Sequence, residues 1–134
     1  TPAIFAFAAA AEAGIQTFRQ DTAREKELLN SLCEQLSALP GLVLTGAHEA
    51  PHILNIAIPG VPTQNTINIL QDAGICVSAG SACAKGHRSH VLTAMGIPGE
   101  TIDSAFRVSL CRDNTQEEID TLVEVIRRDI LPRI

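Results

Sequence analysis

Residues 52–58 read HILNIAI, and their pattern indicates the sheet around which the rest of the chain is organised. Leu54, Ile56 and Ile58 alternate with other residues, so they share one face of an extended chain, and a Pro59-Gly60 turn follows them. The alternation predicts a β-strand with one buried face. We expect three further strands, over residues 42–45, 75–78 and 105–111.

Helical patterns surround these strands. The Thr1-Pro2 start and Gly14 predict a short first helix, and Thr17 with Gln20 resembles the capping box of a longer helix that ends before residues 40–41. A third helix is expected from Thr63 to Leu70, with a stop at Gly74. A fourth is expected from a Ser89 cap to Met95. The last is expected to begin with a capping box at Thr115 and Glu118 and to end at Pro132. In that last helix the acidic pair Glu117-Glu118 is expected to cap the helix, not to catalyse.

Helices that bracket a small group of strands predict an α/β fold, a two-layer sandwich with a mixed or antiparallel sheet. A chain of 134 residues fits one domain with its own core. The composition, 46% hydrophobic and 19% charged, is that of a folded globular protein.

The charge pattern and the apolar segments exclude several functional classes. A net charge of −5 without a basic stripe, and the absence of Trp and Tyr, argue against nucleic acid as a partner. The apolar residues 3–13 are too few to span a membrane, and no Lys or Arg before Arg19 makes the start of a signal peptide. Four irregularly spaced cysteines then indicate reduced thiols and a cytoplasmic protein.

One segment combines a nucleophile with clustered basic side chains: residues 78–92, SAGSACAKGHRSHVL. A thiol attacks as its thiolate, and neighbouring cationic groups favour that form, so Cys83 is the candidate nucleophile. The cationic candidates nearby are Lys85, His87, Arg88 and His90. Glycines 80 and 86 are expected to let the segment move, and the preceding strand places Cys83 at a strand end.

The other thiols and the histidines have simpler explanations. Cys33 is expected in the core, and Cys76 and Cys111 as buried structural thiols. His87 and His90 are either proton-transfer groups or solvated loop side chains. A zinc site made of Cys76, Cys83, His87 and His90 is the third alternative, but its spacing lacks the tight cysteine pair of common structural sites.

Three motifs in chain order carry a family resemblance: SAGSAC at residues 78–83, SHVL-x-AMG at residues 89–96 and FRVSL at residues 106–110. Together they closely resemble the C-terminal part of NifS-like and IscS-like cysteine desulfurases, which are aminotransferase class V proteins of fold type I. The similarity runs from Thr1-Pro2 to residues 114–120 and so covers nearly the whole chain.

The resemblance implies an enzyme that uses pyridoxal phosphate to convert L-cysteine to L-alanine. Cys83 matches the cysteine that accepts the sulfur as a persulfide, for iron-sulfur cluster assembly or other sulfur transfer. Arg107 matches the arginine that binds the substrate carboxylate; the alternative from the residue alone is a surface ion pair. Thr1 matches a threonine that reaches the cofactor phosphate of the partner subunit of a homodimer, and Ser81, His87 and His90 are auxiliary candidates.

One required group has no match. A pyridoxal phosphate enzyme needs a lysine for its cofactor, and neither Lys26 nor Lys85 resembles it. We therefore expect a large cofactor-binding domain in the same polypeptide and no activity from this chain alone. The alternative is a stand-alone persulfide carrier or interaction module without catalysis.

The chain departs from the family pattern at three points. Ala79 and Cys111 replace a commoner serine and a commoner glycine, and the segment from Cys83 to Ser89 is shorter than in the long-loop members. A shorter loop reduces reach, so the identity of the acceptor or iron-sulfur scaffold protein stays open.

Overall fold

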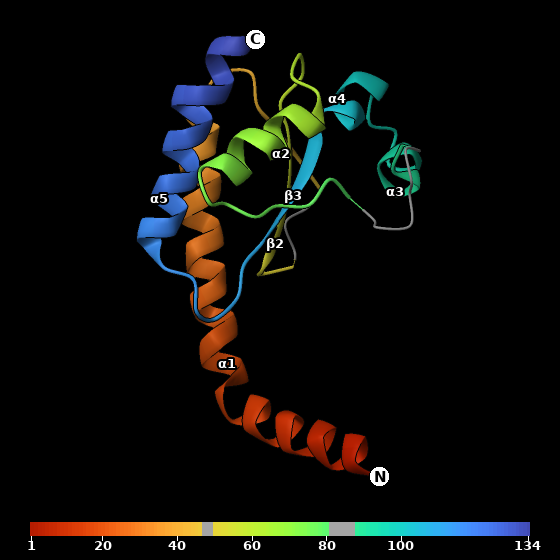
Figure 1. Ribbon diagram of the computed structural model, residues 1–134, viewed down its shortest axis with the longest axis vertical. Helices are drawn as coiled ribbons and strands as arrows, with labels where there is room; N and C mark the ends of the chain where they lie inside the picture. Colours follow the sequence, from red (N-terminus) through yellow and green to blue (C-terminus); the bar gives the residue numbers. More distant parts are fainter. Residues whose placement is uncertain (47–49, 81–87) are drawn as a thin grey trace.

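The computed structural model describes residues 1–46, 50–80 and 88–134, and Figure 1 shows their arrangement. The elements in chain order are α1 (Pro2–Ser37), β1 (Val43–Thr45), β2 (Ile53–Ala57), α2 (Thr63–Asp72), α3 (His90–Ala94), α4 (Gly99–Asp103), β3 (Ala105–Ser109) and α5 (Gln116–Val125). A π-helical turn, Ile126–Ile130, and a 3-10 turn, Leu131–Arg133, extend α5. Among the described residues, no helix has both the length and the apolar character that crossing a membrane requires.

The sheet is antiparallel with the strand order β1-β2-β3, which confirms the predicted α/β fold class. The alternation in residues 52–58 has the predicted effect, because Leu54, Ile56 and Ile58 are all fully buried while Asn55 lies on the opposite face. The expected strand over residues 75–78 is wrong except at its end. Only Ser78 pairs, in an isolated bridge with Arg107 of β3.

The core lies between one face of the sheet and the helices α1, α2 and α5. α1 and α5 run side by side over this face (Figure 1). Phe106 of β3 and Leu32 of α1 are completely buried there, and each such side chain contributes about 1.5–3 kcal/mol by leaving water. The predicted core position of Cys33 is confirmed, since this partly buried side chain packs against the same cluster.

α1 is one helix of 36 residues, so the two helices predicted with a break at Gly14 are wrong. Gly14 is helical, and the N-terminal part of α1 runs at an angle to the remainder and away from the body of the molecule (Figure 1). A glycine costs a helix only about 1 kcal/mol relative to alanine, which alanine-rich neighbours offset. Thr17 therefore lies inside the helix and forms no capping box.

The other helices follow their terminal signals. Thr115 accepts a hydrogen bond from the Glu118 amide while the Glu118 carboxylate accepts one from the Thr115 amide, which confirms the capping box of α5. Ser89 caps α3 through the amide of Leu92. The short helix α4, Gly99–Asp103, was not anticipated in the sequence. Its residues Thr101 and Ile102 are buried, and Ile102 belongs to a small second cluster with Leu92 of α3.

Candidate functional site

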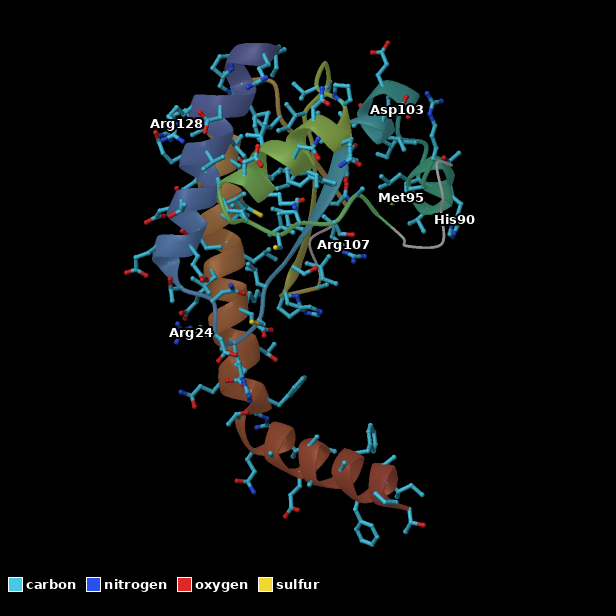
Figure 2. All side chains as sticks on the ribbon, viewed as in Figure 1. Arg24, His90, Met95, Asp103, Arg107 and Arg128 are labelled. Carbon is cyan, nitrogen blue, oxygen red and sulfur yellow. The ribbon has the colours of Figure 1, made fainter. Side chains whose placement is uncertain are left out.

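The candidate substrate-binding residue, Arg107, lies on the face of the sheet opposite the core. Its neighbours in β3, Phe106 and Val108, point into the core and are buried, so the strand alternation exposes Arg107. Figure 2 labels Arg107 at β3, with His90 on α3 in the neighbouring part of the molecule.

A row of polar residues crosses the sheet at Arg107. β1 pairs Thr45 with Asn55, β2 pairs Asn55 with Arg107, and Arg107 forms the bridge with Ser78. The Arg107 amide donates to the Ser78 carbonyl over 2.7 Å, and the Ser78 amide donates to the Arg107 carbonyl over 3.0 Å. The row therefore joins all three strands to the segment that leads toward Cys83.

Ser78 fixes the chain where it leaves this row. Its hydroxyl donates to the Gly80 carbonyl over 2.9 Å, which adds a turn to the two backbone bonds with Arg107. Cys83 follows Ser78 by five residues, and it lies outside the described residues, as do Ser81 and His87. The segment from Ser78 to Arg88, which includes Cys83 and is called the cysteine segment below, is thus anchored at its start by the backbone of Arg107.

Arg107 carries its charge without an acidic neighbour in the part of the chain that the structure describes. The ion pairs there are Arg88 with Asp103, Arg112 with Asp113, Arg127 with Glu124, and Arg128 with Asp129. The alternative of a surface ion pair at Arg107 thus finds no partner among these residues. A guanidinium that has no carboxylate partner among the described residues suits an anionic ligand.

The far end of the cysteine segment is also held in place. The Arg88 guanidinium donates two hydrogen bonds to the Asp103 carboxylate, over 2.7 Å and 2.6 Å, and thereby joins the start of α3 to α4. The same hydrogen bonds hold the pKa of Asp103 below its usual value. His90 is exposed at the first position of α3, where its ring is open to solvent.

The remaining candidates lie apart from this row. Thr1 is exposed at the N-terminal end of α1, and its side chain makes no capping hydrogen bond. Lys26 is exposed on the same helix, and Lys85 falls outside the described residues. Since α1 packs against the other face of the sheet, Lys26 does not fit the role of a cofactor lysine beside Arg107.

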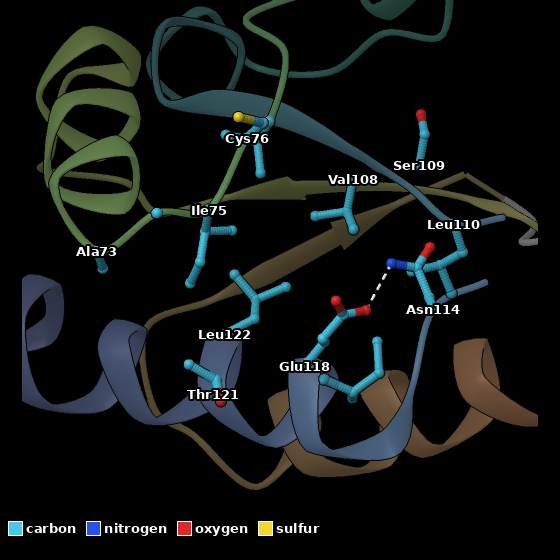
Figure 3. Close-up of a pocket in the computed structure, with 13 residues that line it drawn as sticks. Ala73, Ile75, Cys76, Val108, Ser109, Leu110, Asn114, Glu118, Thr121 and Leu122 are labelled. Atoms are coloured by element: carbon cyan, nitrogen blue, oxygen red, sulfur yellow. Dashed lines mark hydrogen bonds between the residues drawn. The ribbon is translucent and has the colours of Figure 1, made fainter.

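The other cysteines differ in exposure. Burial raises the pKa of the Cys33 thiol, as expected for a core side chain. Cys76 and Cys111 are exposed, so the prediction that both are buried is wrong. Residues 75–77 do not join the sheet, and a 400 Å³ cavity opens between them, β3 and α5 (Figure 3). Cys76 is among the residues that line it.

The same cavity is also lined by a carboxylate. Its carboxylate, Glu118, accepts a hydrogen bond from the Asn114 amide over 2.8 Å and another from the Thr115 backbone (Figure 3). These bonds lower the pKa of Glu118 and commit the group to capping α5, as predicted. For the zinc alternative, Cys83 and His87 lie outside the described residues, and no three potential ligands converge among those described.

Comparison with known proteins identifies the family and several relatives of this chain. The model of the family Aminotransferase class-V matches residues 1–122. A cysteine desulfurase of Nostoc sp. is 36% identical over 132 residues, which cover 93% of this chain and 32% of that protein. The cysteine desulfurase IscS of Escherichia coli is 37% identical over 111 residues, 80% of this chain and 27% of that protein.

Solved structures show the same fold. One titled NifS-like protein superposes with a TM-score of 0.80 at 29% identity, covering 95% of this chain and 32% of that one. A NifS-like protein from Rickettsia africae gives a TM-score of 0.73 at 27% identity, covering 84% of this chain and 29% of that one. The chain thus spans about a third or less of the proteins that it matches. By the family match and these relatives, the chain belongs to the aminotransferase class-V family.

Proposed function

We propose that this chain is the small C-terminal domain of a pyridoxal phosphate-dependent cysteine desulfurase, with Cys83 as the sulfur acceptor and Arg107 as the ligand of the substrate carboxylate. One observation carries the proposal. The segment that leads to Cys83 starts at Ser78, whose backbone bonds directly to Arg107. One strand thus supplies both the group that holds the substrate and the anchor of the nucleophile.

The sulfur transfer balances without an added oxidant. The Cys83 thiolate attacks the sulfur of the bound cysteine, an S–S bond forms, and the Cβ–S bond of the substrate breaks. Its electron pair stays on the three-carbon product, which takes up a proton and leaves as L-alanine, while Cys83 carries a persulfide. Pyridoxal phosphate supplies the electron sink that makes this bond labile.

The residues described in this chain do not hold that cofactor by themselves. The one lysine among them, Lys26, is exposed on α1, away from the Arg107 row. We therefore place the cofactor lysine in a large domain of the same polypeptide, in keeping with relatives of about three times this length. Thr1, whose hydroxyl has no capping bond, is proposed to meet the cofactor phosphate of the partner subunit in a homodimer.

The auxiliary roles belong to the same proposal. His90, exposed on α3, is the described candidate for proton transfer near the cysteine segment, with Ser81 and His87 as the candidates within it. The outer sulfur of the persulfide then passes to the thiol of an acceptor or iron-sulfur scaffold protein, and the Cys83 thiolate is released. Reduction by a small thiol releases the same sulfur as sulfide in an assay.

The test is Cys83→Ala in the full-length enzyme, with Cys76→Ala as the matched control. We expect Cys83→Ala to abolish the formation of alanine and sulfide from L-cysteine while the absorbance of the bound cofactor remains. Cys76→Ala removes another exposed thiol seven residues away and should retain turnover. Turnover by Cys83→Ala would refute the proposal, and a persulfide on Cys83 without alanine would favour the carrier alternative.

A further inference from the structure

Asn55 lies directly opposite Arg107 in the pairing of β2 with β3. The amide and carbonyl of Arg107 bond to Ser78 on the other side of β3, so they are turned away from β2. Asn55 and Arg107 therefore form a pair without mutual backbone hydrogen bonds. In such antiparallel pairs the side chains approach each other most closely, with Cβ atoms about 4.5–5.5 Å apart.

Thr45 fixes the orientation of the Asn55 side-chain amide by a hydrogen bond. Its hydroxyl donates to Oδ1 of Asn55 over 2.6 Å, and Thr45 is only 6% exposed. This bond engages the amide oxygen, which leaves the two N–H donors of Nδ2 for another acceptor. No hydrogen-bond acceptor for Nδ2 is found among the described residues.

The exposed face of the sheet thus carries two adjacent groups that only donate hydrogen bonds, the Arg107 guanidinium and the Asn55 amide nitrogen. We propose that Asn55 is a second ligand of the carboxylate bound by Arg107, and that Thr45 is the positioning residue that turns the amide toward it. A carboxylate has two oxygens and about four acceptor sites, enough for both donors at once. The inference rests on the proposed function, because it takes the substrate carboxylate as the ligand.

The expected effects are those of one hydrogen bond to a charged group. Asn55→Ala in the full-length enzyme should raise the dissociation constant of L-cysteine about 10- to 100-fold. Thr45→Val, which keeps the shape and removes the hydroxyl, should raise it less, and Thr45→Ser should restore most of the lost affinity. Asn30→Ala, at an exposed position of α1, is the matched control and should bind as the wild type does.

The measurement is a titration of the cofactor absorbance with L-cysteine in the Cys83→Ala background, which separates binding from sulfur transfer. A double-mutant cycle adds Arg107→Ala. If both side chains hold one carboxylate, the loss in the double variant should be smaller than the product of the two single losses.

Circular dichroism and the denaturation midpoint show whether each variant is folded. Wild-type affinity in folded Asn55→Ala, or equal effects of Thr45→Val and Thr45→Ser, would overturn the inference. The proposed function fails separately, through turnover by Cys83→Ala or unchanged binding by Arg107→Ala.

Discussion

Arg107 lies on the exposed face of β3 without an ion-pair partner among the described residues. Arg107→Ala in the full-length enzyme should weaken L-cysteine binding by roughly 2–4 kcal/mol, as for loss of one partner of a desolvated charge pair. Arg107→Lys should recover only part of this, because an ammonium lacks the planar pair of donors. The measurement is the Michaelis constant, with Arg112→Ala, another exposed arginine, as the control. An unchanged Michaelis constant for Arg107→Ala would make the residue structural.

Thr115 caps α5 through its hydroxyl, which accepts a hydrogen bond from the Glu118 amide over 3.3 Å. Thr115→Ala should lower the free energy of unfolding by about 1 kcal/mol, because this amide has no other partner in the helix. Thr121→Ala is the matched control, since Thr121 lies exposed inside the same helix and alanine favours a helix. Urea denaturation measures both variants, and equal stability of the two would contradict the capping role.

Among elements, α5 begins with an acidic turn whose charged form is stabilised. Hydrogen bonds lower the pKa values of Glu117, Glu118 and Asp120 in the folded chain. The unfolded chain therefore binds more protons in acid, so this contribution is present above the ordinary carboxyl pKa and is lost as the pH falls through the lowered values.

The second stability prediction uses this acidic turn. The free energy of unfolding should decrease from about pH 6 to about pH 3, and Glu118→Gln should decrease more shallowly because it removes one of these carboxyls but keeps a capping side chain. Urea denaturation across this range measures both slopes. A steeper slope in Glu118→Gln than in the wild type would contradict the assignment.

Elements with strong local signals could be predicted from the sequence. The alternation of residues 52–58 predicted β2, and the Ser89 cap and the Thr115 capping box predicted the starts of α3 and α5. α1 was misread because the glycine penalty is small beside the helical preference of the residues around Gly14. Cys76 was misplaced because an apolar run predicts an extended segment but does not show whether another strand pairs with it.

The candidate site likewise contains residues that local motifs suggest and contacts that only the fold creates. Local motifs suggested Cys83 and Arg107, yet the row from Thr45 through Asn55 to Arg107 and Ser78 depends on strand register. Register brings together residues that are up to 62 positions apart, Thr45 and Arg107, and no local pattern predicts it.

At the scale of the whole molecule, the N-terminal part of α1 is unusually apolar and exposed. Ile4, Phe5, Phe7, Ile15 and Phe18 are between 66% and 76% exposed. The C-terminal half of the same helix buries Leu29, Leu32 and Leu36 in the core. We propose that the large domain covers the exposed half, in keeping with the greater length of the relatives.

This surface predicts how the chain behaves without that domain. The 134-residue chain should self-associate with rising concentration, because exposed apolar surface of this kind favours association. A variant with Phe5, Phe7 and Phe18 changed to glutamine should remain monomeric at the same concentration. Light scattering after size exclusion measures both masses, and Val91→Gln, on α3, serves as the control. A monomeric parent chain, or an associated triple variant, would contradict the prediction.

If Cys83 receives the sulfur of L-cysteine, a persulfide forms on that residue, and mass spectrometry can locate it. The full-length enzyme is exposed to L-cysteine, its thiols are alkylated, and it is cleaved at Lys and Arg. Residues 27–85 then form one peptide that holds Cys33, Cys76 and Cys83, so fragment masses must locate the added sulfur atom. We expect the extra sulfur on Cys83 alone. Its appearance on Cys76 or Cys111, with Cys83 alkylated as a simple thiol, would show that Cys83 is not the sulfur acceptor.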